Sequence, residues 1–209
     1  MSNTFENEPL LPTASFWPDS CIIVRRMQSW SAVPVFTHLF PTAIMQKKVC
    51  LLGASAVGKT SLATRYVRGI FSERYLTTIG VKIDKKTVEV NDQPVELLVW
   101  DLNGEDRFQR LSMNYLRGAS GYVLVADGTA DETLTKALDL YDRASQTYGH
   151  VPAVLLLNKH DLHEDWKLSQ EQVGTLEQAG WMLFYTSAKT GENVDQAFAY
   201  IAEQTLNLN

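Results

Sequence analysis

From about Lys47 onward, the apolar residues fall into short continuous runs that alternate with amphipathic stretches. Runs of roughly four to eight apolar residues between turn residues are typical of strands, and apolar residues recurring every three or four positions are typical of helices. The predicted strands are 49–52, 82–90, 95–100, 121–126, 151–157 and 182–185. The predicted helices are 59–69, 108–116, 131–148, 169–178 and 193–205.

The order of these elements predicts an open α/β sheet. The turn residues Asn91-Asp92-Gln93-Pro94 separate strands 82–90 and 95–100, so these two strands should form a hairpin. The other strands alternate with helices, which favours parallel pairing. We therefore predict a six-stranded, mostly parallel sheet with helices on both faces. The loops after the strands then meet at one edge, where ligands of such folds bind.

Residues 1–45 differ from the rest of the chain. They contain five of its seven prolines and no sustained periodicity, which predicts an irregular or disordered leader before an ordered domain over 46–209. The acidic residues Glu6, Glu8 and Asp19 argue against a secretory signal or an organellar presequence. Because the ordered pattern begins near Met45, one hypothesis is that the natural chain starts there.

Composition narrows the class of protein. The chain is 45% apolar and 21% charged, as is usual for a globular domain, and its net charge of −5 argues against nucleic-acid binding. Two cysteines suit a reducing compartment, and no stretch has the roughly 20 apolar residues of a membrane helix. The last residues contain no cysteine for prenylation, and Ser2 excludes myristoylation. We expect a soluble, cytoplasmic protein with no lipid anchor.

The segment Gly-Ala-Ser-Ala-Val-Gly-Lys-Thr-Ser at 53–61 directly follows the first strand. Its glycines let the backbone wrap around a phosphate chain, and the N–H groups of the loop and the next helix point at anionic oxygens. Lys59 would reach the outer phosphates, and the Thr60 hydroxyl would bind Mg²⁺. The other residues of this predicted nucleoside triphosphate site are Ser55, Ala56, Val57, Gly58 and Ser61.

Three more polar segments follow predicted strands. They are Asp101-Leu102-Asn103-Gly104, Asn158-Lys159-His160-Asp161 and Ser187-Ala188-Lys189. Together with the glycine loop, and in this order, they resemble the Ras superfamily of small GTPases. The Rab branch is the most similar, from Thr-Ile-Gly-Val at 78–81, Trp-Asp at 100–101 and Tyr-Leu-Arg-Gly-Ala at 115–119. The resemblance runs from Lys47 to about Leu206 and implies a P-loop NTPase small G domain that binds GTP and GDP with Mg²⁺.

The resemblance also assigns the residues that bind the base: Phe71, Asn158, Lys159, Asp161, Ser187, Ala188 and Lys189. The Asp161 carboxylate can accept from the N1 and N2 hydrogens of guanine, a pair that adenine lacks. Asn158 would brace the base and the loop, Lys159 would lie over the purine, and Phe71 would pack on its other side. A backbone N–H around Ala188 would donate to the guanine carbonyl. Without the partner motifs, 158–161 could be only a polar loop.

Around the phosphates, the resemblance assigns Thr60, Thr78 and, through a water, Asp101 to Mg²⁺. The Thr78 backbone and the Gly104 N–H would sense the outermost phosphate, and Tyr75 would close over the nucleotide. Loss of that phosphate would release both anchors, which is how such switches work. The alternatives are a helix N-cap for Asp101 and an ordinary loop aromatic for Tyr75.

One of the departures from the family pattern affects hydrolysis. Glu105 stands where the family has the glutamine that orients the attacking water. An ionised glutamate cannot donate a hydrogen bond to the attacking water, so we expect slow GTP hydrolysis. Lys59 is the other predicted catalytic residue. Alternatively, Glu105 could act as a base if its pKa is raised. The alternative is a hydrolysis-deficient pseudo-GTPase that acts as a nucleotide-bound scaffold. Residues 158–161 disfavour an ATP-using P-loop kinase.

The resemblance implies protein partners as well, including effectors, activating proteins and exchange proteins. Ile83, Trp100 and Tyr115 occupy positions where Rab proteins place an apolar triad that contacts effectors. The alternative is that all three only pack the hairpin against its neighbouring helix. The histidines, including His160 and His163, have no ligand spacing and are interpreted as solvated loop residues.

Overall fold

The computed structural model describes residues 44–72, 78, 80–102 and 113–207 of the 209-residue chain. Nearly all of the predicted leader lies outside these residues, as do Tyr75, Gly104 and Glu105 and the first part of the predicted helix 108–116. The expectations for those positions therefore stay predictions.

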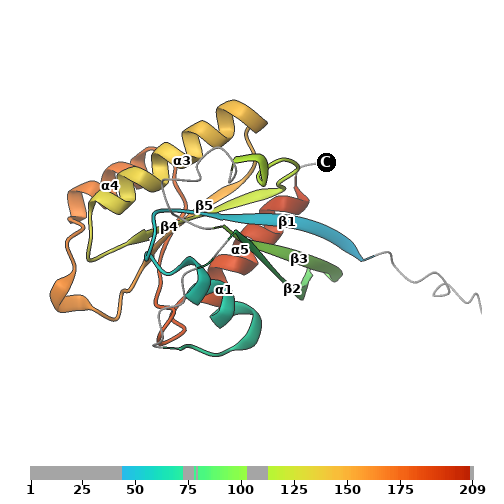
Figure 1. The fold of residues 1–209 in the computed structure, drawn as a ribbon, viewed down its shortest axis with the longest axis horizontal. Helices are drawn as coiled ribbons and strands as arrows, with labels where there is room; N and C mark the ends of the chain where they lie inside the picture. The colour runs from blue at the N-terminus through green and yellow to red at the C-terminus, as the bar shows by residue number, and fades with distance from the viewer. Residues whose placement is uncertain (1–43, 73–77, 79, 103–112, 208–209) are drawn as a thin grey trace, which may run out of the picture. The chain divides into compact units, whose positions relative to one another are not determined.

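The strands in the described part of the chain form one six-stranded sheet in the order β2-β3-β1-β4-β5-β6 (Figure 1). They are β1 Met45–Leu52, β2 Val81–Val90, β3 Gln93–Leu102, β4 Gly121–Asp127, β5 Ala153–Asn158 and β6 Leu183–Tyr185. Strand β2 runs antiparallel to β3, and every other neighbouring pair is parallel. The predicted six-stranded, mostly parallel sheet is confirmed.

Helices cover both faces of this sheet, as predicted. The described α-helices are α1 Lys59–Arg68, α3 Glu132–Tyr148, α4 Gln170–Gln178 and α5 Val194–Leu206, with a single 3₁₀ turn, η2, at His163–Asp165. Helices α1 and α5 lie on one face, and α3 and α4 lie on the other (Figure 1). Helix α4 begins with the predicted Ser169 cap, which forms a reciprocal capping box with Gln172. None of the helices described is long and apolar enough to cross a membrane.

The hairpin turn is shorter than predicted. Only Asn91 and Asp92 form it, with φ angles of 50° and 60°, and β3 already begins at Gln93. Asn and Asp tolerate this left-handed conformation, and two such residues make a tight connection that matches the twist of the strands. Pro94, predicted to lie in the turn, is inside β3, one residue before β3 begins to pair with β1.

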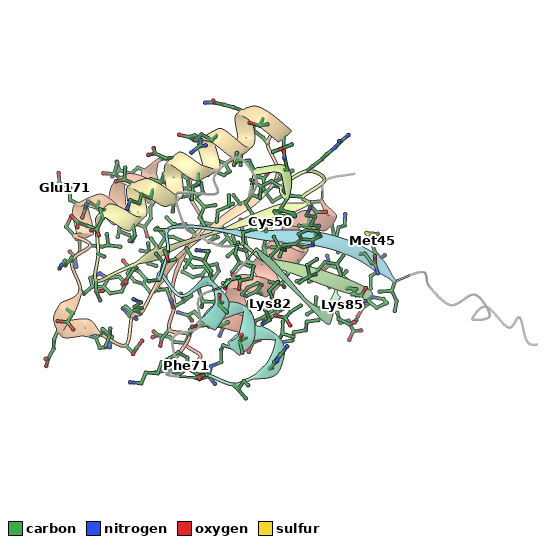
Figure 2. The ribbon with its side chains drawn as sticks, viewed as in Figure 1. Met45, Cys50, Phe71, Lys82, Lys85 and Glu171 are labelled. Carbon is green, nitrogen blue, oxygen red and sulfur yellow. The ribbon has the colours of Figure 1, made fainter. Side chains whose placement is uncertain are left out.

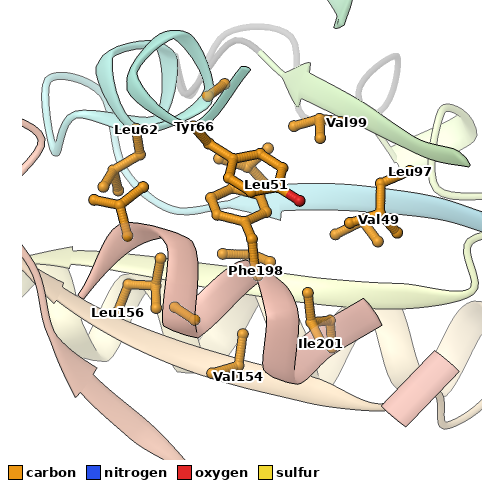
Figure 3. Close-up of a cluster of buried hydrophobic side chains, with 14 of the residues drawn as sticks. Val49, Leu51, Leu62, Tyr66, Leu97, Val99, Val154, Leu156, Phe198 and Ile201 are labelled. Atoms are coloured by element: carbon orange, nitrogen blue, oxygen red, sulfur yellow. The ribbon is translucent and has the colours of Figure 1, made fainter. Parts of the chain in front are cut away.

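The core lies on both sides of the central strands because successive side chains point to opposite faces. Val49 and Leu51 of β1 face α1 and α5, whereas Cys50 and Leu52 face α3 and α4. Between the first pair of helices, Tyr66 of α1 stacks on Phe198 of α5, with ring centroids 4.0 Å apart and planes 7° from parallel (Figure 3). This stack fixes α1, and with it the glycine loop at its start, against the sheet.

We expect Phe198→Ala to lower the free energy of unfolding by about 3–5 kcal/mol, because a buried ring is lost and a cavity remains. Gln196→Ala, at an exposed position on the same helix, is the matched control and should change stability by less than about 0.5 kcal/mol. Urea unfolding of both variants in one buffer measures the difference. Equal midpoints for the two variants would show that the stack does not anchor α1.

Candidate functional site

The glycine loop between β1 and α1 is closed by the side chain of Lys59. The Lys59 Nζ donates to the carbonyl oxygens of Gly53, at 3.0 Å, and Ala54, at 2.6 Å. Lys59 is only 6% exposed, and this burial lowers its pKa to about 8, although Asp101 opposes the shift. A buried ammonium whose hydrogen bonds within the described part of the chain go to neutral carbonyl groups is suited to an anion at this loop.

The backbone of the loop needs unusual conformations. Ser55 and Ala56 are exposed at its tip, Ala56 has a φ of 63°, and Val57 beneath them is buried. Gly58 has a φ of 100°, and a Cβ atom there would lie 2.3 Å from the Asn158 Nδ2. Glycine is therefore required at 58 both for its backbone angle and for the close approach of that amide.

Three oxygen-bearing side chains meet next to Lys59. The Thr60 hydroxyl donates to Asp101 Oδ2 at 2.6 Å and lies 2.6 Å from the Thr78 hydroxyl, which is itself 3.3 Å from Asp101 Oδ2. The sequence predicted these residues as the Mg²⁺ group, and the fold brings all three together from α1, β3 and position 78.

The chemistry of this cluster fits Mg²⁺. Asp101 is buried, which raises the pKa of its carboxyl group, while the Thr60 hydrogen bond and Lys59 oppose the shift. Its Oδ1 atom is buried and has no hydrogen-bond partner among the residues that the structure describes. One carboxylate and two hydroxyl groups are hard oxygen ligands, and Mg²⁺ takes few protein ligands when water and phosphate supply the rest. Among the described residues, no group of three His, Cys, Asp or Glu side chains offers a different metal site.

The buried amide of Asn158 joins the glycine loop to the loop after β6. Its Nδ2 donates to the Val57 carbonyl at 2.8 Å, and its Oδ1 accepts from the Ala188 N–H at 3.2 Å and the Thr186 hydroxyl at 3.5 Å. Asn158 is 1% exposed. A backbone N–H around Ala188 is predicted to donate to the guanine carbonyl, and the N–H of Ala188 itself donates to Asn158 in this structure.

The predicted base-reading residues lie beside this amide. Asp161 Oδ1 accepts a hydrogen bond of 2.6 Å from the buried Ser187 hydroxyl, so the two base motifs are in direct contact. Lys159 has a φ of 65°, and its Nζ lies 2.5 Å from Asp127 Oδ2. Sequence reasoning missed Asp127; the available signal was its position at the end of β4, where it pairs in register with Asn158.

Three other predicted residues lie at the margins of the site. Ser61 is half-buried within α1, and Lys189 is exposed. Phe71 lies just beyond the end of α1 (Figure 2) and packs against the core cluster formed by α1 and α5. Its predicted contact with the base stays a prediction.

The interpretation of His160 as a solvated loop residue is wrong. Its ring is half-buried, with centroid distances of 4.8 Å to His163, 5.1 Å to Trp166 and 5.0 Å to Tyr185. Its Nδ1 lies 3.1 Å from Glu192 Oε1. The apolar surface of these rings covers the imidazole, because η2 and the end of β6 bring them to the same side of the loop.

The three candidate effector residues form one partly exposed surface. Ile83 and Trp100 are directly opposite each other on β2 and β3, and the rings of Trp100 and Tyr115 are 6.4 Å apart. Ile83 is 48% exposed and Tyr115 is 42% exposed, so these two are not core residues. The Lys48 ammonium lies 3.9 Å from the centre of the Trp100 ring, and this cation–π contact restricts the ring.

A sequence model of the Ras family matches residues 48–207 of this chain. The chain belongs to the Ras family of small GTPases. It is 40% identical to "Ras-related protein Rab7" of Drosophila melanogaster over 174 residues, which is 77% of this chain and 81% of that protein. It is 35% identical to "Ras-related protein Rab-13" of Canis lupus familiaris, with 82% of each chain covered. Identity to "Ras-related protein Rab-3C" of Bos taurus is 33%, over 75% and 70% of the two chains.

Membership of the Ras family confirms the resemblance inferred from the four motifs, including its Rab-like character. It makes this small GTPase a GTP-binding switch, whose glycine loop is the family's P-loop. The roles of individual residues, the rate of hydrolysis and the protein partners are matters for proposal.

We expect Gly58→Ala to lower the free energy of unfolding by about 1–3 kcal/mol, because the new methyl group displaces the Asn158 amide and the backbone angle disfavours alanine. The same change should speed nucleotide release. Gly174→Ala is the matched control, since a Cβ atom in that part of α4 meets nothing within 4 Å. Thermal unfolding and nucleotide dissociation of both variants measure the effects, and identical behaviour of the two would contradict the bracing role of Asn158.

Proposed function

We propose that this Ras-family GTPase holds a guanine nucleotide and Mg²⁺ at the sheet edge formed by residues 53–61, 158–161 and 187–189, and hydrolyses GTP slowly. The observation that carries this proposal is the position of Asn158. One buried amide is bonded both to the glycine loop and to the base motif, so the phosphate-binding and base-binding segments belong to one site.

Lys59 supplies positive charge for the outer phosphates, at a loop that already concentrates backbone N–H groups at the start of α1. Thr60, Thr78 and, through water, Asp101 would hold Mg²⁺, which neutralises phosphate charge when bound. The contact between the Thr60 and Thr78 hydroxyls supports a switch, because a bound Mg²⁺ would be held by residues of both α1 and position 78. Loss of the outermost phosphate would weaken the attachment of Thr78 to α1 and so change the protein surface that Thr78 belongs to.

Asp161 would provide guanine specificity. Its Oδ1 accepts from the Ser187 hydroxyl, and a carboxylate can still accept two parallel hydrogen bonds from the N1 and N2 groups of guanine. Adenine offers no such donors and would leave a carboxylate unpaired, a difference that can reach roughly 10⁴–10⁵ in discrimination.

The surface formed by Ile83, Trp100 and Tyr115 is the proposed contact for protein partners. Two of its side chains are well exposed, and the third is restricted by Lys48. A rigid aromatic with apolar neighbours is typical of residues that dominate interface energies. Ile83 and Trp100 lie on β2 and β3, and Trp100 directly precedes Asp101, so partner binding here would be close to the proposed Mg²⁺ group.

We expect Asp161→Asn to shift preference from guanine to xanthine nucleotides, because an amide can donate to the 2-oxo group that xanthine has in place of the 2-amino group. Competition binding with GDP and XDP measures the shift. Asp165→Asn removes the same charge at an exposed position of η2 and should leave the preference unchanged. Retained guanine preference in Asp161→Asn would argue against this role.

For Glu105, we expect unaided GTP turnover on the order of 10⁻⁴–10⁻² s⁻¹ and a faster rate in Glu105→Gln, since glutamine can orient the attacking water by both donating and accepting. Single-turnover assays measure both, with Glu203→Gln on the exposed side of α5 as the control. An unaided rate of several per second in the unmodified protein would contradict slow hydrolysis. Absence of turnover in both proteins would favour the scaffold function.

A further inference from the structure

Arg65, on α1, holds the loop after β6 through its guanidinium group. Its Nε donates to the Ala188 carbonyl at 2.8 Å, and its Nη2 donates to the Lys189 carbonyl. Its Nη1 donates to the carbonyl of Gly69, which caps α1, at 3.0 Å. All three nitrogens of one side chain are thus bonded to backbone carbonyls, two of them in the segment assigned to the base.

The Ala188 backbone is held from two sides. Asn158 Oδ1 accepts a hydrogen bond from the Ala188 N–H, and Arg65 Nε donates a hydrogen bond to the Ala188 carbonyl oxygen. In a trans peptide the carbonyl of one residue and the N–H of the next point in opposite directions. The hydrogen bond from Arg65 to the Ala188 carbonyl therefore turns the N–H of Lys189 away from the guanidinium. The peptide group between Ala188 and Lys189 lies one residue after Ser187, which contacts Asp161.

We propose that Arg65 is a positioning residue for base recognition: it fixes the peptide plane between Ala188 and Lys189 so that the Lys189 N–H faces the 6-oxo group of guanine. This inference rests on the proposed guanine site. It also gives the loop a second attachment, because α1 begins with Lys59 and Thr60 and Arg65 lies less than two helical turns later. The helix that carries the phosphate-binding residues thereby also sets the position of the base-binding loop.

Helix α1 offers a matched control in Arg68, one turn beyond Arg65. Arg68 is exposed and donates to Asp84 Oδ1 on β2 at 3.1 Å, so it attaches the helix to the sheet rather than to the base loop. Arg65→Met and Arg68→Met remove the same group from the same helix, but only Arg65→Met removes the hydrogen bonds to Ala188 and Lys189.

The experiment measures dissociation rates of GDP, 6-thio-GDP and IDP from the full chain with Mg²⁺, for the unmodified protein and both variants. We expect Arg65→Met to release GDP roughly tenfold faster and Arg68→Met to stay within about twofold. Sulfur accepts hydrogen bonds poorly, so the unmodified protein should release 6-thio-GDP faster than GDP. That penalty should shrink in Arg65→Met, whereas the penalty for IDP, which lacks the 2-amino group read by Asp161, should not change.

A purely structural role would speed release of all three nucleotides by the same factor, and that result would overturn the proposal. Equal GDP release from Arg65→Met and Arg68→Met would overturn it too. Arg65→Lys keeps the charge but not the planar fork, so its rates should lie between those of the unmodified protein and Arg65→Met, and it serves as the test if Arg65→Met does not fold. Equal affinity of the unmodified protein for GDP and ADP would instead refute the guanine site itself.

Discussion

The geometry of the candidate site depends on one buried amide. Asn158 donates to the glycine loop and accepts from the loop after β6, and an amide that is 1% exposed must have such partners because burying it unpaired is costly. The place that the Asn158 amide occupies also restricts the residue at position 58 of the glycine loop. Position 58 must be glycine because a side chain there would occupy the place of the Asn158 Nδ2.

Around that amide, the fold buries two charged side chains, Lys59 and Asp101, whose opposite charges offset the effect of burial only in part. Lys59 is buried against neutral carbonyls, and one carboxylate oxygen of Asp101 has no hydrogen-bond partner within the described residues. Buried charges of this kind are costly unless something of opposite charge approaches them. An anion beside Lys59 and a hard cation beside Asp101 would satisfy both, which is the arrangement that a magnesium-bound phosphate chain provides.

The sequence predicted the parts of this structure in which local pattern and tertiary environment agree. Strand β4 is buried on both faces, so its continuous apolar run identified it almost to the residue. Strand β1 begins at Met45, earlier than predicted, because Gln46, Lys47 and Lys48 are polar and the continuous apolar run starts only at Val49. The contacts from Arg65 to Ala188 and from Lys159 to Asp127 join residues 123 and 32 positions apart, so only the folded chain reveals them. His160 was misinterpreted for the same reason, since rings from η2 and β6 cover it.

We propose that the loops at 53–61, 158–161 and 187–189 form a single site for a guanine nucleotide with Mg²⁺. Chromatography of the nucleotide released when the protein is purified in Mg²⁺ buffer and then denatured tests it most directly, together with elemental analysis for magnesium. We expect guanine nucleotide and magnesium to be released, each in a molar amount comparable to that of the protein. Adenine nucleotide, or a folded protein that retains no nucleotide and binds no added GDP, would contradict it.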